Sequence, residues 1–439
     1  MGWHNATSKV EPGAAKLTRR TLLTAAPGTL LAATACSGSS PGRTGSAGRE
    51  VSLTYGLWDD TQLPAMKKII ANFERANPRI TVRPVLTPWD SYWTKLQTAA
   101  TGGTAPDVFW MTQDSFKLYA SGGVLMGLDD LVARDKIDIG NYVESVTHGY
   151  SWQGKLYGMP KDINSFGVFY NKKLFAAANI RPPGLSWTWS DLVQVAQRLT
   201  DRAAGVFGFA AQLADVEGYY LTIPQAGGYV ISQDGTKSGY DDPRTIRGLE
   251  FWTDMILKYR VSPTLQQLTD TAAQSMFTSG KLAMYFGGSW EPVAMKAVPY
   301  ARENTDVGPL PKDLNRRFYA NGLGNVIFAK TKHPQESWEF AKFLGSQQAA
   351  EIQAATGTVI PAYKGMDEAY SKSMPEFSMS KLIGQLPQGL AFPASVSTAV
   401  WENDALKEFA DAWTGKKSAA SVAKSVAARM NAALAKEPH

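Results

Sequence analysis

The sequence is poor in the side chains that most often bind metals and form crosslinks. Among 439 residues there are one cysteine and four histidines. A single thiol excludes an intramolecular disulfide and a cysteine-based metal site. Three of the histidines (His148, His333 and His439) follow residue 35, and no two of them have the four-residue spacing of a helical zinc pair. We therefore expect neither a metal nor a cofactor.

Sequence motifs of the common enzyme classes are incomplete. Residues 287–291 resemble a nucleophile elbow but end in glutamate where the motif needs glycine. Residues 235–238 lack the upstream glycine and the Gly-Lys pair of a phosphate-binding loop, and residues 322–327 have two of the three glycines of a dinucleotide fingerprint. We predict no catalytic residues and no enzyme. An exported carbohydrate-active enzyme is the alternative, because acid pairs such as Asp59–Asp60 occur.

Residues 1–35 have the organisation of a bacterial export signal. A positive segment precedes an apolar segment at 22–35, which is shorter than the roughly 20 residues that span a bilayer. The paired Arg19 and Arg20 resemble a twin-arginine signal. Small residues then lead into Cys36 and resemble a lipoprotein cleavage box, although the first of them is alanine where that box usually has leucine. We predict lipidation of Cys36; secretory cleavage that leaves a free thiol is the alternative.

Residues 36–49 are mostly Ser, Gly, Pro, Ala and Thr, a composition typical of a flexible tether. The remaining chain, from residue 50, exceeds what one hydrophobic core usually organises, so two domains are expected. The formal net charge is +6. Residues 1–35 hold four basic residues and one acidic residue, and no run of basic residues follows them. We expect no nucleic-acid partner.

Strand and helix patterns alternate along this second part of the chain. Strands are expected at 51–57, 80–86, 107–111 and 282–286. Helices are expected at 66–77, 90–101, 190–199, 334–344 and from 243 onward, with Ser190 and Asp242 as N-caps. Such alternation predicts α/β domains with parallel sheets, in which ligands bind at the carboxyl ends of the strands.

The aromatic residues are the strongest positive signal. The chain has 13 tryptophans. Several of them stand where an expected strand ends, namely Trp58, Trp89, Trp110 and Trp290. Aromatic faces stack on the C–H faces of sugar rings, while nearby carboxylates and amides bind the hydroxyls, and this combination is typical of a small-molecule cleft. The alternative for each tryptophan is a place in the core.

Four stretches, in this order, carry a resemblance to a known family. They are 66–78 with 80–82; 103–110 with 114 and 122–125; 154–161 with 169–175; and 280–290 with 308–311. The chain resembles the family-1 extracellular solute-binding proteins, the carbohydrate receptors of ABC importers, a family that includes maltose-binding protein. The resemblance extends over nearly all of the chain after the signal.

The resemblance implies two α/β lobes of the type II periplasmic-binding-protein fold, with the ligand in a cleft between them. We expect lobe one at 50–161 plus 321–364, and lobe two at 162–320 plus 365–437. The implied function is capture of a sugar or oligosaccharide outside the cell and delivery to an ABC permease, by a monomer held at the cell membrane through a lipid on Cys36. A sensory sugar-binding lipoprotein is a further alternative.

Residues near strand ends and lobe crossings are the expected ligand contacts. They are Trp58, Asp59, Trp89, Asp114, Asp162, Asn164, Tyr219, Gly288, Trp290, Asn321 and Gly322. Three of them have a second interpretation, which is helix N-capping for Asp114, a hinge salt bridge for Asp162 and core packing for Trp290.

Overall fold

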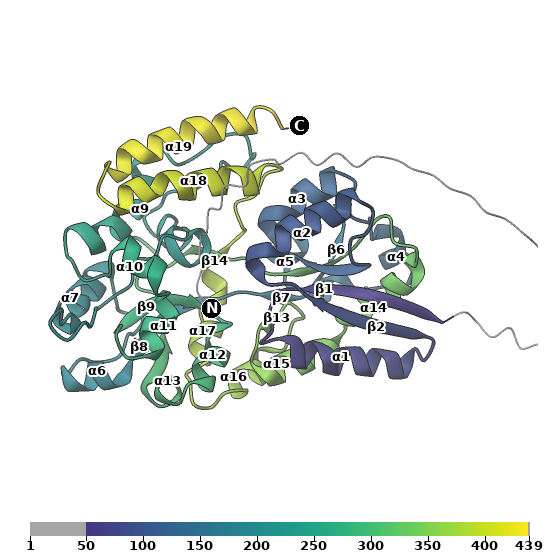
Figure 1. The fold of residues 1–439 in the computed structure, drawn as a ribbon, viewed down its shortest axis with the longest axis horizontal. Helices are drawn as coiled ribbons and strands as arrows, with labels where there is room; N and C mark the ends of the chain where they lie inside the picture. The colour runs from purple at the N-terminus through teal and green to yellow at the C-terminus, as the bar shows by residue number, and fades with distance from the viewer. Residues whose placement is uncertain (1–49, 438–439) are drawn as a thin grey trace, which may run out of the picture. The chain divides into compact units, whose positions relative to one another are not determined.

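The computed structural model describes residues 50–437, in which helices and strands alternate as expected (Figure 1). In chain order the helices are α1 (Leu63–Ala76), α2 (Trp89–Thr101), α3 (Gln113–Ser121), α4 (Asp129–Arg134), α5 (Glu144–Gly149), α6 (Lys172–Ala177), α7 (Trp189–Leu199), α8 (Tyr220–Thr222), α9 (Pro243–Leu257), α10 (Leu265–Asp270), α11 (Ala273–Thr278), α12 (Glu291–Ala297), α13 (Pro299–Asn304), α14 (Pro334–Leu344), α15 (Gln347–Thr356), α16 (Asp367–Lys372), α17 (Ser380–Ile383), α18 (Thr398–Trp413) and α19 (Ala419–Leu434).

The first lobe is built on a five-stranded sheet of order β2-β1-β3-β12-β6. Its strands are β1 (Val51–Leu57), β2 (Ile80–Leu86), β3 (Val108–Met111), β6 (Gly158–Pro160) and β12 (Gly324–Ile327). Strand β1 pairs in parallel with β2 and β3, whereas β12 is antiparallel to both β3 and β6. The expected all-parallel sheet is therefore wrong for β12. This strand enters the sheet at Gly324, opposite the last residue of β3, Met111, so it must run in the reverse direction.

Strand β3 has core on both of its faces. Val108 and Trp110 pack into one apolar cluster, with the α1 and α14 side chains Phe73 and Phe340, whereas Phe109 packs into another, with α2 and α3. Burial on both faces explains why the strand reads as a continuous apolar run. The helices follow their expected patterns, since α1 buries its apolar stripe and ends before Asn77, and α14 ends at Gly345.

The second lobe is built on a three-stranded sheet of order β10-β8-β9. Its strands are β8 (Phe166–Asn171), β9 (Met284–Gly288) and β10 (Thr305–Gly308), and both pairings are antiparallel. The expected parallel sheet is wrong here too, because β8 enters from the first lobe at Phe166, opposite the last residue of β9, Gly288. Strand β9 also begins two residues later than the expected 282–286.

Two helix starts test the capping predictions. Asp242 caps α9 as expected, with its side chain accepting a hydrogen bond from the backbone N–H of Arg244. Ser190 is not the cap of α7. Thr188 occupies that position and forms a reciprocal capping box with Asp191, so the helix begins at Trp189.

The chain passes between the two sheets through short paired strands. It leaves the first sheet after β6 and joins the second at β8, and β7 (Asp162–Ile163) lies on this passage, paired with β13 (Ile360–Pro361). It returns between β10 and β12, where β11 (Phe318–Tyr319) pairs with β14 (Gly389–Leu390). A two-stranded hairpin, β4 (Ser151–Trp152) with β5 (Lys155–Leu156), lies before the first passage.

Candidate functional site

Tryptophans gather where β1, β2 and β3 end. Trp58 follows β1 and lies edge-on to Trp89, at 5.2 Å between ring centroids, and to Trp110, at 5.1 Å. Trp93 joins them at 5.8 Å from Trp89. Trp110 is fully buried, whereas the other three rings are partly exposed. The parallel strands thus bring two of the expected contacts, Trp58 and Trp89, into one aromatic wall.

Trp93 was missed by the sequence analysis, although its spacing carries a signal. It lies four residues after Trp89 in α2, so both rings project from the same face of the helix. We call Trp58, Trp89 and Trp93 the aromatic wall.

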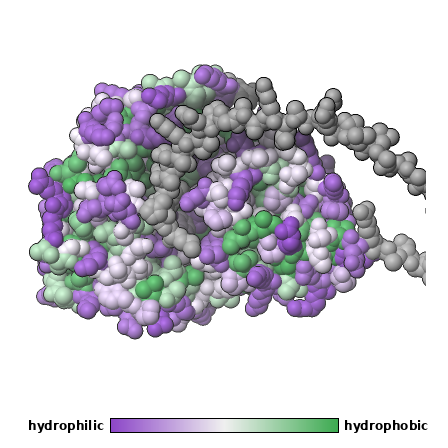
Figure 2. Space-filling model, in the orientation of Figure 1, coloured by the Kyte–Doolittle hydropathy of each residue, from purple (hydrophilic) through white to green (hydrophobic). Residues whose placement is uncertain are grey.

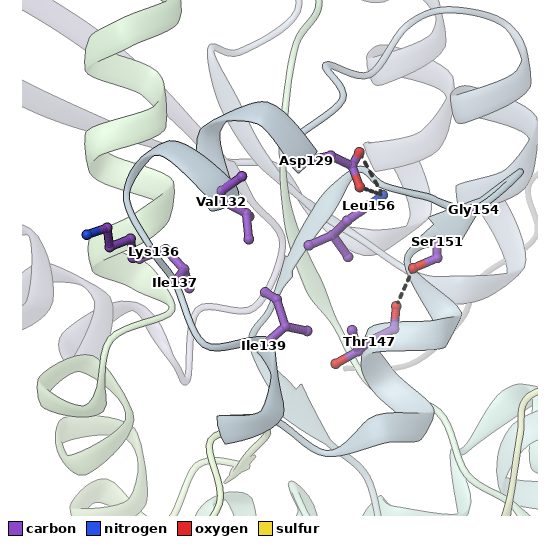
Figure 3. A pocket seen from close by; sticks show the side chains of 10 residues that line it. Asp129, Val132, Lys136, Ile137, Ile139, Thr147, Ser151, Gly154 and Leu156 are labelled. Carbon is purple, nitrogen blue, oxygen red and sulfur yellow. Dashed lines mark hydrogen bonds between the residues drawn. The ribbon is translucent and has the colours of Figure 1, made fainter.

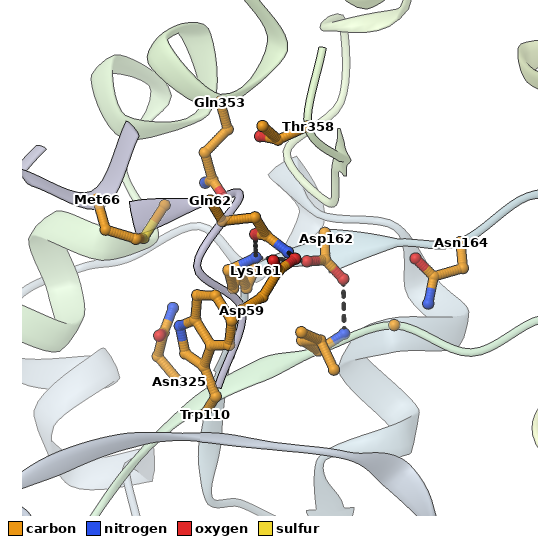
Figure 4. Close-up of polar contacts among 12 residues, drawn as sticks. Asp59, Gln62, Met66, Trp110, Lys161, Asp162, Asn164, Asn325, Gln353 and Thr358 are labelled. Atoms are coloured by element: carbon orange, nitrogen blue, oxygen red, sulfur yellow. Dashed lines mark hydrogen bonds and ion pairs between the residues drawn. The ribbon is translucent and has the colours of Figure 1, made fainter. Parts of the chain in front are cut away.

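A chain of polar contacts, buried except at Asp59, runs from the end of β1 to the first passage between the lobes (Figure 4). The Asp59 carboxylate accepts a hydrogen bond from Gln62 Nε2 at 2.8 Å, and Gln62 Oε1 accepts one from Lys161 Nζ at 2.7 Å. Lys161 Nζ lies 2.6 Å from Asp162 Oδ2, and both side chains are 1 % exposed. Asp162 Oδ1 accepts from the backbone N–H of Leu323 at 2.8 Å.

This arrangement corresponds to the second interpretation of Asp162, a hinge salt bridge, because both of its carboxylate oxygens have protein partners. Lys161 also lies over the Trp110 ring, with Nζ 4.4 Å from the centroid. Asp59 is partly exposed, and its second oxygen accepts hydrogen bonds from the backbone and side chain of Thr61. The contact between Gln62 and Lys161 joins residues 99 positions apart, and no sequence pattern predicts it.

Residues expected where the chain crosses between the lobes form hydrogen bonds with one another. The Asn164 backbone N–H donates to the Asn321 carbonyl oxygen at 2.7 Å, and their side-chain amides are joined at 2.9 Å. Gly322 lies so close to the first passage that a Cβ there would come within 2.2 Å of the Asp162 carbonyl oxygen. These residues hold the outward and return passages side by side.

Trp290 lies two residues after the end of β9, on the second lobe. Its ring is partly exposed and lies edge-on to Phe166 at 5.7 Å. The ring covers the backbone at the end of the strand, since a Cβ on Gly288 would come within 2.2 Å of it. Only glycine at 288 leaves room for this ring position.

Tyr219 is fully buried in the second lobe. Its ring packs against Tyr220 at 5.2 Å and Phe409 at 5.3 Å. Among the described residues, its hydroxyl and that of Tyr240 have no hydrogen-bond partner.

Asp114 lies in the first turn of α3, after β3. The N-cap of this helix is Thr112, so Asp114 does not have the capping role that was its second interpretation. The side chain is partly exposed, and Ser115 Oγ lies 3.1 Å from Oδ2. Burial raises the pKa of the carboxyl. The neighbouring Lys117 Nζ donates to the Ala394 carbonyl oxygen at 2.7 Å, a contact between the first lobe and the segment before α18.

The sequence analysis missed four further carboxyl groups, whose pKa values are raised by burial. They are Asp215 and Glu217 in a π-helical turn (Asp215–Tyr219), Glu291 at the start of α12 and Glu402 in α18. Burial and neighbouring charges raise the pKa of Asp215 to about 6 and that of Glu217 to about 8. We call these four and Asp114 the acidic set. Apart from Asp215 and Glu217, which share one turn, its members come from separate elements, so no motif could reveal it.

A cavity of the described chain lies away from these residues (Figure 3). It has a volume of about 330 Å³ and is lined mainly by α4 and by the segments leading to β4 and β5, with Val132, Ile137, Ile139 and Leu156 as its apolar side chains. None of the expected ligand contacts lines it. Asp129 at its rim accepts hydrogen bonds from the backbone N–H of Leu156. Within residues 50–437, no three His, Cys, Asp or Glu side chains could together hold a metal ion.

Comparison with known proteins gives a consistent result. Residues 59–351 match the model of the bacterial extracellular solute-binding proteins. A galactooligosaccharide-binding protein of Bacillus subtilis is 25% identical over 368 residues, which are 80% of this chain and 82% of that protein. A diacetylchitobiose-binding protein of Streptomyces coelicolor is 25% identical over 430 residues, 93% of this chain and 97% of that protein.

Among solved structures, an ABC substrate-binding protein of Listeria monocytogenes in complex with cycloalternan superimposes with a TM-score of 0.83. The match covers 88% of this chain and 100% of that one at 24% identity. At this identity the superposition establishes the two-lobed fold.

Proposed function

The chain belongs to the bacterial extracellular solute-binding protein family, and on this basis we propose that it is the substrate-binding component of an ABC importer for a sugar or oligosaccharide. One observation carries the sugar assignment. Partly exposed tryptophan rings follow strand ends in both lobes, with the aromatic wall on one and Trp290 on the other. Rings of this kind provide stacking faces for sugars, and carboxylates beside them can bind hydroxyls.

The proposed ligand site lies between lobe one, residues 50–161 plus 321–364, and lobe two, residues 162–320 plus 365–437. The separate sheets and the paired strands on each passage support this division. We propose that Trp58, Asp59, Trp89 and Asp114 contact the ligand from lobe one, and that Trp290 does so from lobe two, beside Gly288. Asn164, Asn321 and Gly322 line the passages. Closure of the lobes would bury the sugar.

We propose that the protein binds its ligand without turning it over. We also propose that it is a monomer. Its large exposed apolar side chains are spread over separate elements, and Figure 2 shows polar and apolar residues mixed on the face that it draws. Scattered apolar residues need no partner chain to cover them. The partner of the loaded protein would be the transmembrane part of the permease.

The proposed location is the outer side of the cell membrane, with a lipid on Cys36 as the anchor. The export signal and Cys36 lie outside the described residues. No helix within residues 50–437 is long and apolar enough to cross a membrane.

Replacing Cys36 with serine should release the protein from the membrane fraction into the medium or periplasm, because the acyl chains have no other attachment point. Immunoblotting of fractionated cells measures this. A Cys36→Ser protein that remains in the membrane fraction would remove the lipid anchor from the proposal.

Binding of mono- and oligosaccharides by the purified chain tests the proposed function. Thermal unfolding is a suitable first measurement, because a ligand that binds only the folded state raises the melting temperature.

A further inference from the structure

Besides the paired strands on the passages, helices α3 and α18 bring the two lobes into contact (Figure 1). Helix α3 is rooted in lobe one, where Phe116 shares an apolar cluster with the β3 residue Phe109. Helix α18 is rooted in lobe two, where Trp413 shares a cluster with β8 and β9. Beside these helices, Lys117 Nζ of α3 donates to the Ala394 carbonyl oxygen at 2.7 Å. This hydrogen bond therefore joins one lobe to the other.

Ala394 lies in the segment 391–397, between β14 and α18, which we call the strap. Glu437, which follows α19 near the end of the chain, fixes the strap to lobe two. Its carboxylate accepts four hydrogen bonds from three successive strap residues, Ser395, Val396 and Ser397. Burial raises the pKa of the Glu437 carboxyl, but these hydrogen bonds outweigh burial and hold the pKa below its usual value. A charged carboxylate thus sets the conformation in which the strap presents the Ala394 carbonyl.

The ammonium that meets this carbonyl is half-buried. Burial lowers the pKa of Lys117, and the charge of Glu437 raises it in partial compensation. Glu437 therefore acts on the contact twice, by holding the strap and by its charge. A hydrogen bond with a charged donor contributes more to stability than one between neutral groups. Separation of the lobes would break this bond, so the contact favours the closed arrangement.

We propose that Lys117 and the strap form a latch that holds the lobes closed in the ligand-free protein, and that Glu437 positions it. The proposal rests on the binding of ligand between two lobes, and adds to it a contact made by protein groups alone. A ligand that needs the closed state binds more weakly when that state is rarely populated. The latch therefore raises the affinity for a ligand that it does not touch.

The distance between the lobes in the ligand-free protein tests the latch directly. Spin labels at Gln97→Cys in α2 and Ser421→Cys in α19 lie at exposed positions, one in each lobe. Cys36→Ser removes the one native cysteine, so that only these two sites react. Electron paramagnetic resonance should give a short distance for the parent protein. Lys117→Met should shift the distribution toward a longer distance, because the hydrogen bond across the lobes is lost.

Glu437→Gln should shift the distribution in the same direction, since a neutral amide is a poorer acceptor for the strap. Combining it with Lys117→Met should open the protein no further than Lys117→Met alone, because both residues act through one contact. Lys68→Met, at an exposed position of α1, is the matched control and should leave the distance unchanged. Melting temperatures check that each variant is folded.

A saccharide that binds the parent protein gives a second measurement. Lys117→Met should weaken its binding about tenfold, as calorimetric titration would show. Saturating saccharide should restore the short distance in this variant, because the ligand then supplies the closure energy.

The outcomes separate the latch from the function on which it rests. A ligand-free parent protein with only the longer distance, or Lys117→Met with the distances of the parent, would overturn the latch and leave sugar binding intact. Glu437→Gln with the distances of the parent would remove the positioning role of Glu437. A protein that opens on Lys117→Met but binds no saccharide would keep the latch and overturn the proposed function.

Discussion

Replacing Lys161 with methionine should lower the free energy of unfolding by about 3–5 kcal/mol. The substitution leaves the Asp162 carboxylate buried without its cation, since both side chains are 1 % exposed. It also removes the hydrogen-bond donor to Gln62 Oε1, and this buried oxygen is then left without a partner. Urea denaturation followed by circular dichroism measures the change.

Two control variants show whether burial is the cause. Lys161→Met combined with Asp162→Asn removes both charges and should recover much of the lost stability, because replacing a whole buried pair costs far less than removing one partner. Lys372→Met breaks the exposed pair with Glu368 and should leave stability nearly unchanged. If Lys161→Met behaves like Lys372→Met, the polar chain at the hinge does not stabilise the fold.

Replacing Trp290 with alanine should weaken sugar binding roughly ten- to a hundredfold, corresponding to ~1–3 kcal/mol for the loss of one large apolar contact face. The fold should tolerate the change, because the ring is partly exposed and lies on the backbone at Gly288. Calorimetric titration with a bound sugar gives the affinity, and urea denaturation gives the stability.

Trp338 provides the matched control. It is fully buried in α14, and its Nε1 donates to Asp135 at 2.8 Å. Trp338→Ala should cost ~3–5 kcal/mol of stability. A similar loss for Trp290→Ala would identify Trp290 as a core residue, the second interpretation given to it.

Periodicity and capping signals predicted the local structure well. Apolar spacing placed α1 and α14, and the Asp242-Pro243 pair placed the start of α9. Strand directions could not be predicted from such signals. The directions of β8 and β12 depend on the end of the sheet at which the chain enters when it arrives from the other lobe. The error at Ser190 has a local cause, since a threonine two residues earlier forms the capping box.

For the site, the sequence could predict residues that follow strands but not their long-range partners. Trp58 and Trp89 meet because parallel strands end at one edge of the sheet. The contact of Lys161 with Gln62 and that of Lys117 with the Ala394 carbonyl oxygen join residues far apart in the chain. Such contacts depend on how the lobes fold and meet, and local sequence patterns do not predict this.

Thermal unfolding of the purified protein with a panel of mono- and oligosaccharides tests the central claim of sugar binding most directly. At about 100 times its dissociation constant, a true ligand should stabilise the folded state by roughly 2.7 kcal/mol, which appears as a clear rise in melting temperature. The effect of that ligand on Trp290→Ala at the same concentration should be smaller. A cooperatively unfolding protein whose melting temperature does not change with any saccharide would contradict the claim.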